Sequence, residues 1–251
     1  AASDVYKRQG KRALMIADTT TFELFGSKVQ RLLGSAGLEV QCSLIKGADM
    51  ATIAKVQRIV KDDVDFLLGV GGGTCIDVAK VASFKEGKPF ISVPTAASHD
   101  GICSSRASIR GGREPTSIKT HAPIAIVADT IVIKSAPHRL LAAGCGDLVA
   151  NFTAVRDWEM AHRLFGEPYS EYAALLSLLS SKIVMDNAEL IKRHTEESVR
   201  KVVKALISSS VAMAIAGSSR PASGAEHLFS HALDQIAPKP GLCSTTDFRR
   251  H

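Results

Sequence analysis

Short runs of apolar residues alternate with helical patterns along the first half of the chain. The apolar runs predict strands over 13–17, 38–45, 65–70, 89–93 and 124–128, with helices over 20–37, 50–62 and 76–85 between them. Apolar strands separated by helices are typical of parallel sheets covered on both faces. A further strand over 107–115 turns through Gly111 and Gly112, which predicts a hairpin at the flank of the sheet.

The strand pattern stops near Ser135, and helical periodicity replaces it. The pattern predicts helices over 140–165, 170–191, 196–216 and 224–236, with Gly166, Pro168, Gly217 and Pro221 between them. We therefore expect an α/β nucleotide-binding domain over 11–136 and an all-α domain over 137–251. Residues 1–10 show no periodicity that joins them to the first strand, and we interpret them as a non-native tail.

Composition narrows the possible environments of the protein. The 251 residues carry a formal net charge of +6, but no block of like charges indicates a nucleic-acid arm. The five cysteines are scattered and form no Cys-x-x-Cys pair, which argues against a disulfide framework and favours the cytoplasm. No apolar run approaches the roughly 20 residues that span a bilayer. A small anionic substrate or cofactor suits the mild positive charge.

Three consecutive glycines, Gly71 to Gly73, follow the predicted strand over 65–70 and precede a helix. Glycines let backbone N–H groups approach an anion, and a helix N-terminus adds the positive end of its dipole. A pyrophosphate is therefore expected at Gly72 to Thr74. The sequence matches neither Gly-x-Gly-x-x-Gly nor a Walker loop, and a purely structural tight turn is the alternative.

A second polar cluster begins where the strand over 89–93 ends. Small hydroxyl residues and Asp100 follow Pro94, in the sequence Thr95-Ala-Ala-Ser-His-Asp100. This composition is typical of a loop that hydrogen-bonds ribose, a nicotinamide amide or substrate hydroxyls. The alternative is an Asx or Ser/Thr turn without a ligand.

Two histidines lie four residues apart in the last predicted helix. His227 and His231 therefore share one face of that helix, and Asp147 is the best upstream partner for them. Two imidazoles and a carboxylate form a ligand set suited to zinc or ferrous iron. Alternatively, each histidine makes only a local hydrogen bond.

Four motifs in this order resemble one family of enzymes. The motifs are Gly71-Gly-Gly-Thr-Cys-Ile-Asp-Val-Ala-Lys80, Pro94-Thr-Ala-Ala-Ser-His-Asp-Gly101, Gly144-Cys-Gly-Asp147 and the segment 217–234. They resemble the sn-glycerol-1-phosphate dehydrogenases, in the superfamily of glycerol dehydrogenases, iron-dependent alcohol dehydrogenases and dehydroquinate synthases. The resemblance implies a dehydroquinate synthase-like fold and NAD(P)H-dependent reduction of dihydroxyacetone phosphate to sn-glycerol 1-phosphate, the backbone of archaeal-type phospholipids.

The resemblance also implies roles for individual residues. Asp147 and His227 would bind the metal, which is Zn²⁺ with Fe²⁺ or Ni²⁺ as alternatives, and Asp100 and His231 would act on the substrate beside Asp147. The residues implied in dinucleotide binding are Gly71, Gly72, Gly73, Thr74, Cys75, Ile76, Asp77, Thr95, Ala96, Ala97, Ser98 and Ser104. The third metal ligand of the family, a histidine, is absent after Leu242, where Cys243 follows. We therefore expect an incomplete metal site, in a protein that forms a homo-oligomer when intact.

Two further residues are candidates, each with a structural alternative. Arg220 precedes the histidine helix and is a candidate for the substrate phosphate, or a surface arginine. Asp18 follows the first strand and is a candidate for the adenosine ribose, which favours NADH, or a helix cap. Three other functions stay open: a glycerol dehydrogenase, a dehydroquinate synthase and an inactive nucleotide-binding fragment.

Overall fold

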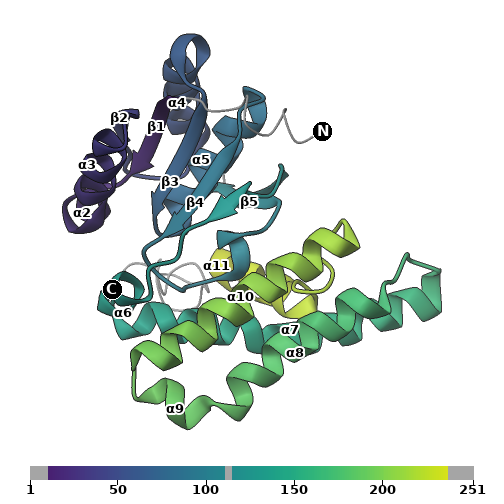
Figure 1. Ribbon diagram of the computed structural model, residues 1–251. Helices are drawn as coiled ribbons and strands as arrows, with labels where there is room; N and C mark the ends of the chain where they lie inside the picture. Colours follow the sequence, from purple (N-terminus) through teal and green to yellow (C-terminus); the bar gives the residue numbers. More distant parts are fainter. Residues whose placement is uncertain (1–10, 111–114, 237–251) are drawn as a thin grey trace, which may run out of the picture.

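The computed structural model describes residues 11–110 and 115–236 (Figure 1). In Figure 1 the first half of the described chain forms a sheet with helices around it, and the second half forms a group of long helices beneath. The predicted α/β part followed by an all-helical part is therefore confirmed. The proposed tail over 1–10 and the residues around Cys243 lie outside the described residues.

Five parallel strands form the central sheet in the order β2-β1-β3-β4-β7. They span Arg12–Ala17 (β1), Glu39–Leu44 (β2), Phe66–Gly71 (β3), Phe90–Pro94 (β4) and Ala125–Ile126 (β7). All five predicted strands are present, although β7 is only two residues long. Because β1 lies between β2 and β3, the strand order reverses there, and the carboxyl ends of β1 and β3 meet at a position where open α/β sheets bind ligands.

Helices cover both faces of this sheet. They span Thr19–Thr21 (α2), Phe22–Gly26 (η1, a π-helix), Ser27–Ser35 (α3), Met50–Asp63 (α4) and Gly73–Lys85 (α5). Alternate residues of β1 face the two layers: Leu14 and Ile16 pack in the core shared with α4 and α5, whereas Ala13 and Met15 pack against η1 and α3. The helix predicted over 20–37 is thus divided by a π-helical turn.

A small antiparallel hairpin lies beside the sheet, as predicted. Its strands are Arg106–Arg110 (β5) and Pro115–Lys119 (β6). The predicted turn at Gly111 and Gly112 lies outside the described residues. A 3-10 turn, Asp100–Ile102 (η2), leads from β4 toward this hairpin.

The second half of the described chain contains helices and no strand. They span Thr130–Ser135 (α6), His138–Phe165 (α7), Glu171–Asp186 (α8), Ala188–Lys192 (α9), Glu196–Ala216 (α10) and Ala225–Ile236 (α11). Gly166 and Gly217 end α7 and α10 in the left-handed conformation, with φ of 67° and 66°. The prediction missed α6 and did not separate α9 from α8.

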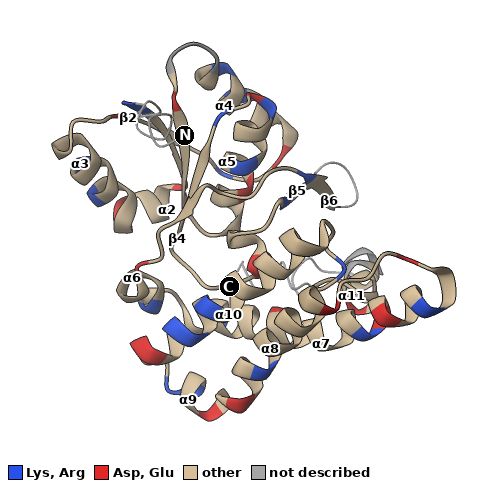
Figure 2. Cartoon of the chain, turned by 45° about the vertical axis from the view of Figure 1, so that its right-hand side comes forward, with Lys and Arg blue, Asp and Glu red and all other residues tan. Residues whose placement is uncertain are grey.

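One continuous core joins the two halves. Buried residues of α7 and α10, among them Leu141, Leu148 and Leu206, belong to the same apolar cluster as Ile76 of α5 and Phe90 of β4. Figure 2 shows acidic and basic residues interspersed along α7, α8, α9 and α10. No helix among the described residues is long and apolar enough to cross a membrane.

Candidate active site

A cavity of about 480 Å³ lies at the carboxyl ends of β1, β3 and β4. Segments that follow these three strands line it from the sheet side, and the α6–α7 region lines it from the helical side. The residues that line it include Asp18, Gly72, Gly73, Thr74, Thr95, Ala96, Ser98, Pro137 and Arg139. The cavity is therefore where the sequence predicts a dinucleotide.

Gly72 and Gly73, the last two residues of the triple glycine, form part of the sheet-side wall of this cavity. Gly72 is the N-cap residue of α5 and makes no side-chain cap, so N–H groups of the first turn of α5 lie beside the cavity. Cys75 and Ile76 have fully buried side chains, and their backbone N–H groups donate to the carbonyl of Gly72 over 3.1 and 3.2 Å, so their predicted contacts with the dinucleotide stay predictions. The predicted pyrophosphate position at Gly72 to Thr74 thus coincides with a cavity wall.

Asp18 both lines this cavity and caps a helix. Its Oδ1 accepts a hydrogen bond of 2.7 Å from the backbone N–H of Thr21, and its backbone N–H donates to Thr21 Oγ1 over 3.2 Å. Its Oδ2 accepts from Cys75 Sγ at 3.5 Å. Burial raises the pKa of the Cys75 thiol, so the sulfur stays a neutral donor to this carboxylate. Oδ1 caps the helix, and Oδ2 can accept from a ribose hydroxyl in addition to the thiol, so the cap and the predicted ribose contact do not exclude each other.

The loop over 95–98 is fastened to both halves of the protein. The backbone N–H of Thr95 donates to the carbonyl of Gly71 over 3.0 Å. On the other side, a Cβ added to Gly144 in α7 would collide with the carbonyl oxygen of Ala97. This close approach explains why the Gly-Cys-Gly-Asp motif begins with glycine, and it places Asp147 one helical turn further along α7.

A second, smaller cavity of about 230 Å³ contains the predicted metal ligands. Asp147 of α7 and His227 of α11 both line it, and their Oδ1 and Nε2 atoms lie 4.0 Å apart. Two atoms that bind one tetrahedral zinc ion at about 2.0–2.2 Å lie about 3.4 Å apart, so an approach of roughly 0.6 Å would bring this pair onto a shared metal ion. Ser98 lines both cavities, which therefore adjoin at that residue.

The imidazole of His227 is oriented by the residue that precedes it. Its Nδ1 lies 2.8 Å from Oε1 of Glu226. A carboxylate at Nδ1 stabilises the Nδ1–H tautomer, which leaves the Nε2 lone pair directed to Asp147. Among the described residues, no group of three His, Cys, Asp or Glu side chains gathers around one point. The described part of the site therefore offers a metal two ligands, Asp147 and His227, and one orienting carboxylate, Glu226.

Asp100 lies beside Asp147 at the start of η2. Its backbone N–H donates to Asp147 Oδ2 over 2.8 Å, and its own Oδ2 accepts from the hydroxyl of Ser209 over 2.8 Å. Ser209 is held in turn by Asn151 Nδ2 at 2.8 Å, and Ser210 donates to the Asp100 carbonyl. Burial and the neighbouring Asp147 carboxylate raise the pKa of Asp100 well above its ordinary value. Asp100 is therefore suited to hold a proton close to the predicted metal ligands.

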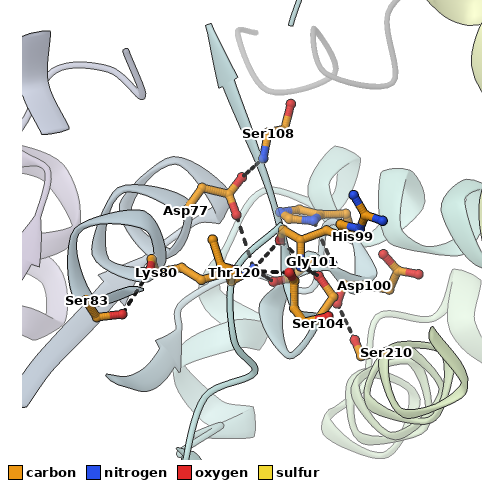
Figure 3. A network of polar contacts seen from close by, with 12 residues as sticks. Asp77, Lys80, Ser83, His99, Asp100, Gly101, Ser104, Ser108, Thr120 and Ser210 are labelled. Carbon is orange, nitrogen blue, oxygen red and sulfur yellow. Dashed lines mark hydrogen bonds and ion pairs between the residues drawn. The ribbon is translucent and has the colours of Figure 1, made fainter. Parts of the chain in front are cut away.

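A buried lysine fixes the turn that carries Asp100. Lys80 Nζ donates to the carbonyls of Gly101 and Arg106 over 2.7 and 2.6 Å and lies 3.3 Å from Asp77 Oδ1 (Figure 3). Burial lowers the pKa of Lys80, whereas the Asp77 carboxylate acts in the opposite direction. Three acceptors around one ammonium make this a positioning contact for η2.

His99 is a site residue that the sequence did not single out. Its Nδ1 accepts from the backbone N–H of Gly101 over 2.9 Å, and it lines the smaller cavity. A Cβ at Gly73 or at Gly101 would collide with its ring. The imidazole therefore lies between the glycine-rich turn and η2, and a side chain at Gly73 or Gly101 would displace it.

Several predicted residues lie elsewhere than expected. Asp77 is buried and accepts from the backbone N–H of Ser108 over 3.2 Å, and it lines the smaller cavity rather than the one at the triple glycine. Ser104 also lines the smaller cavity, and its hydroxyl donates to the Arg106 carbonyl over 3.1 Å. Their predicted dinucleotide contacts stay predictions. His231 lies on α11, but its side chain is outside the described residues.

Arg220 pairs with an acidic side chain outside both cavities. It lines neither cavity, and its Nε and Nη2 atoms donate to the two carboxylate oxygens of Glu167 over 2.6 and 2.5 Å. A bidentate pair of this kind engages the guanidinium, which supports the structural alternative, and the phosphate contact stays a prediction. Arg106 lies in the smaller cavity instead, and it is the only lysine or arginine among the described residues that line it.

Comparison with known proteins agrees with the geometry. The family described as iron-containing alcohol dehydrogenase matches residues 2–137. The chain is 58% identical to a Thermococcus sibiricus protein over 243 residues, 96% of this chain and 69% of the relative, and 56% identical to a Thermococcus kodakarensis protein over 92% and 66%. Both relatives are named glycerol-1-phosphate dehydrogenase [NAD(P)+]. The chain thus spans about two thirds of their length.

Solved structures show the same fold. A glycerol dehydrogenase from Schizosaccharomyces pombe is similar with a TM-score of 0.79 and 24% identity, over 93% of this chain and 61% of that chain. A probable glycerol dehydrogenase from Sinorhizobium meliloti gives a TM-score of 0.78 with 22% identity, over 98% and 70%. The identities to the two Thermococcus proteins, together with the match to the family model, show that the chain belongs to the glycerol-1-phosphate dehydrogenase family, within the iron-containing alcohol dehydrogenases.

Proposed function

We propose that this chain forms the dinucleotide-binding part and most of the substrate cavity of a metal-dependent enzyme that reduces dihydroxyacetone phosphate to sn-glycerol 1-phosphate with NAD(P)H. The observation that carries the proposal is the pairing of Asp147 Oδ1 with His227 Nε2, 4.0 Å apart, in a cavity that adjoins the glycine-rich cavity at Ser98. The relatives named for this activity support the choice of substrate.

The residues of the smaller cavity have separate tasks in this proposal. Asp147 and His227 would hold the metal, with Glu226 keeping the His227 proton on Nδ1. When bound, a divalent metal supplies Lewis-acid polarisation of the substrate carbonyl, and the dinucleotide supplies the hydride. Asp100, with its raised pKa, holds a proton close to the developing alkoxide oxygen. Ser98 separates the two cavities, so the reacting groups would meet beside it.

The substrate phosphate needs a cation in this cavity. The carboxylate of Asp147 repels a phosphate, and Arg106 is the only lysine or arginine among the described lining residues. A guanidinium binds phosphate with a planar set of donors. We therefore assign the phosphate to Arg106, and Arg106→Ala is expected to weaken the binding of dihydroxyacetone phosphate more than that of dihydroxyacetone.

We also infer cytoplasmic localisation and a homo-oligomeric state. The described cysteines, Cys42, Cys75, Cys103 and Cys145, are free thiols, which supports a reducing compartment. Light scattering of the purified protein tests the oligomeric state.

The test of the function measures dinucleotide and metal separately. The chain should bind NADH, seen as enhanced NADH fluorescence, and Zn²⁺, measured by calorimetry. His227→Ala should lose zinc affinity while NADH binding stays within about twofold, because the histidine lies in the other cavity. Dihydroxyacetone phosphate, but not dihydroxyacetone, should compete with inorganic phosphate for the zinc-loaded protein. Equal competition by the two ketones would favour a polyol dehydrogenase instead.

A further inference from the structure

One arginine of the dinucleotide cavity has no role in the mechanism above. Arg139 lies in the first turn of α7 and lines this cavity from the helical side. Its Nε and Nη1 atoms are buried and have no hydrogen-bond acceptor among the described residues. A buried donor of a charged group that lacks an acceptor is costly, which suggests an acceptor that is not part of the protein.

The other charged side chain among the described lining residues of this cavity is an anion. Among the described lining residues, Asp18 and Arg139 are the two charged ones, and Asp18 accepts the backbone N–H of Thr21 over 2.7 Å as a helix cap. Arg139 is therefore the single cationic side chain among the described residues that face the cavity.

Two helix N-termini face the same space. Gly72 and Gly73 at the start of α5 line the cavity, as do Pro137 and Arg139 at the start of α7. Neither N-cap residue, Gly72 nor Pro137, caps its helix with a side chain. The positive ends of two helix dipoles thus combine with a guanidinium on the opposite wall from the triple glycine.

We propose that Arg139 binds the pyrophosphate of the dinucleotide from the helical side, so that both halves of the protein hold the same anion. The proposal rests on the proposed use of a dinucleotide cofactor. Pyrophosphate is the anionic group that NAD and NADP share, and the relatives are named for both cofactors. Since the anion then bridges α5 and α7, dinucleotide binding also stabilises the packing of the two halves.

The test is a titration of the full chain with NADH, NADPH, ADP-ribose and adenosine. Arg139→Ala should raise the dissociation constants of NADH, NADPH and ADP-ribose by about 10- to 100-fold, whereas adenosine, which lacks phosphate, should bind as before. Arg139→Lys keeps the charge but not the planar donor set, so an intermediate loss is expected. It also serves as the second variant if Arg139→Ala does not fold.

Arg156→Ala is the matched control. Arg156 is also on α7, but it is exposed and pairs with Glu159 at 3.0 Å, so its loss should leave all four affinities unchanged. Weaker binding of NADPH alone in Arg139→Ala would overturn the proposal, because it would assign the arginine to the 2′-phosphate. Unchanged NADH binding would overturn it as well. Failure of the unmodified chain to bind NADH would instead overturn the dinucleotide site itself.

Discussion

The Nδ1 atom of His227 lies 2.8 Å from a carboxylate oxygen of Glu226, its neighbour along α11. The same Glu226 oxygen accepts the backbone N–H of Gly224 over 2.8 Å, so the carboxylate is itself fixed at the start of the helix. The imidazole is thereby held with Nε2 toward Asp147 before any metal binds. The arrangement corresponds to the orienting carboxylates found behind metal-bound histidines.

Removal of this carboxylate should weaken metal binding without removing a ligand. Glu226→Ala is expected to lower zinc affinity about 10- to 100-fold, because the histidine loses its preferred tautomer and orientation. Glu226→Gln, whose amide oxygen still accepts from Nδ1, should lose less. Calorimetric titration with Zn²⁺ measures the zinc affinities of both variants. Glu197→Gln, on the exposed face of α10, is the control and should leave zinc affinity unchanged. Zinc affinity that Glu226→Ala leaves unchanged would refute the orienting role.

Gly144 and Gly146 in α7 provide a matched pair for stability. A Cβ at Gly144 would collide with the Ala97 carbonyl, whereas a Cβ at Gly146 has no neighbour within 4 Å. Gly144→Ala should therefore destabilise the protein by about 1–3 kcal/mol through displacement of the dinucleotide loop. Gly146→Ala should stabilise it by up to about 1 kcal/mol, since alanine is the better helix former. Comparing the urea denaturation midpoint of each variant with that of the unmodified chain tests both expectations.

The sequence predicted those features whose signals are local. The strands β1 to β4 follow from apolar runs, and Gly166 and Gly217 end helices where the pattern placed them. By contrast, α6 begins at Thr130, after its N-cap Asp129, and is only six residues long. It therefore has too few residues for a helical period to show in the sequence. The start of α5 was placed at Ile76, because Gly73 has no apolar side chain, although the helix begins there.

The long-range contacts could not be predicted from one sequence. Arg220 was assigned to the phosphate because it precedes the histidine helix, but its partner Glu167 lies 53 residues earlier, and nothing in the local pattern connects the two. Arg139 likewise belongs to a segment without a glycine-rich motif, and Arg106 ends the hydroxyl-rich segment after Asp100 with no local signal that marks it as a phosphate ligand. Their roles depend on which cavity the fold turns them toward.

Asp49 provides a test of pH dependence that is independent of the site. Its side chain caps α4 by accepting from the backbone N–H of Thr52 over 2.7 Å, and this hydrogen bond lowers the pKa of Asp49. A lowered carboxyl pKa contributes stability above the unfolded-state pKa, and that stability is lost as the pH falls through the folded-state pKa. Asp49→Ala should cost about 1 kcal/mol at pH 7. The difference in free energy of unfolding between Asp49→Ala and the unmodified chain should therefore become smaller below about pH 4. Urea denaturation of both proteins at about pH 7 and at about pH 3 measures this change.

Metal affinity should depend on residues beyond those described. Asp147 and His227 supply two ligands, whereas a protein zinc site usually has three or four. A chimera in which the C-terminal third of the Thermococcus sibiricus relative follows Leu242 is expected to bind zinc orders of magnitude more tightly than the present chain. The same chimera with the histidines of the added segment replaced by alanine is the control. Equal zinc affinities of chain and chimera, by calorimetry, would show that the third ligand lies within the present chain.

Cofactor preference should depend on the charge of Asp18, which lines the dinucleotide cavity and caps α2. A carboxylate there accepts hydrogen bonds from ribose hydroxyls and repels a 2′-phosphate, so we expect both cofactors to bind with NADH preferred. Asp18→Gly should shift the ratio of the two affinities about 10-fold toward NADPH, but it also removes the cap. Asp18→Asn separates the two effects, because asparagine caps a helix as well as aspartate does and carries no charge. If the ratio moves in both variants, the charge sets the preference. If it moves in neither, Asp18 acts only as the cap of α2.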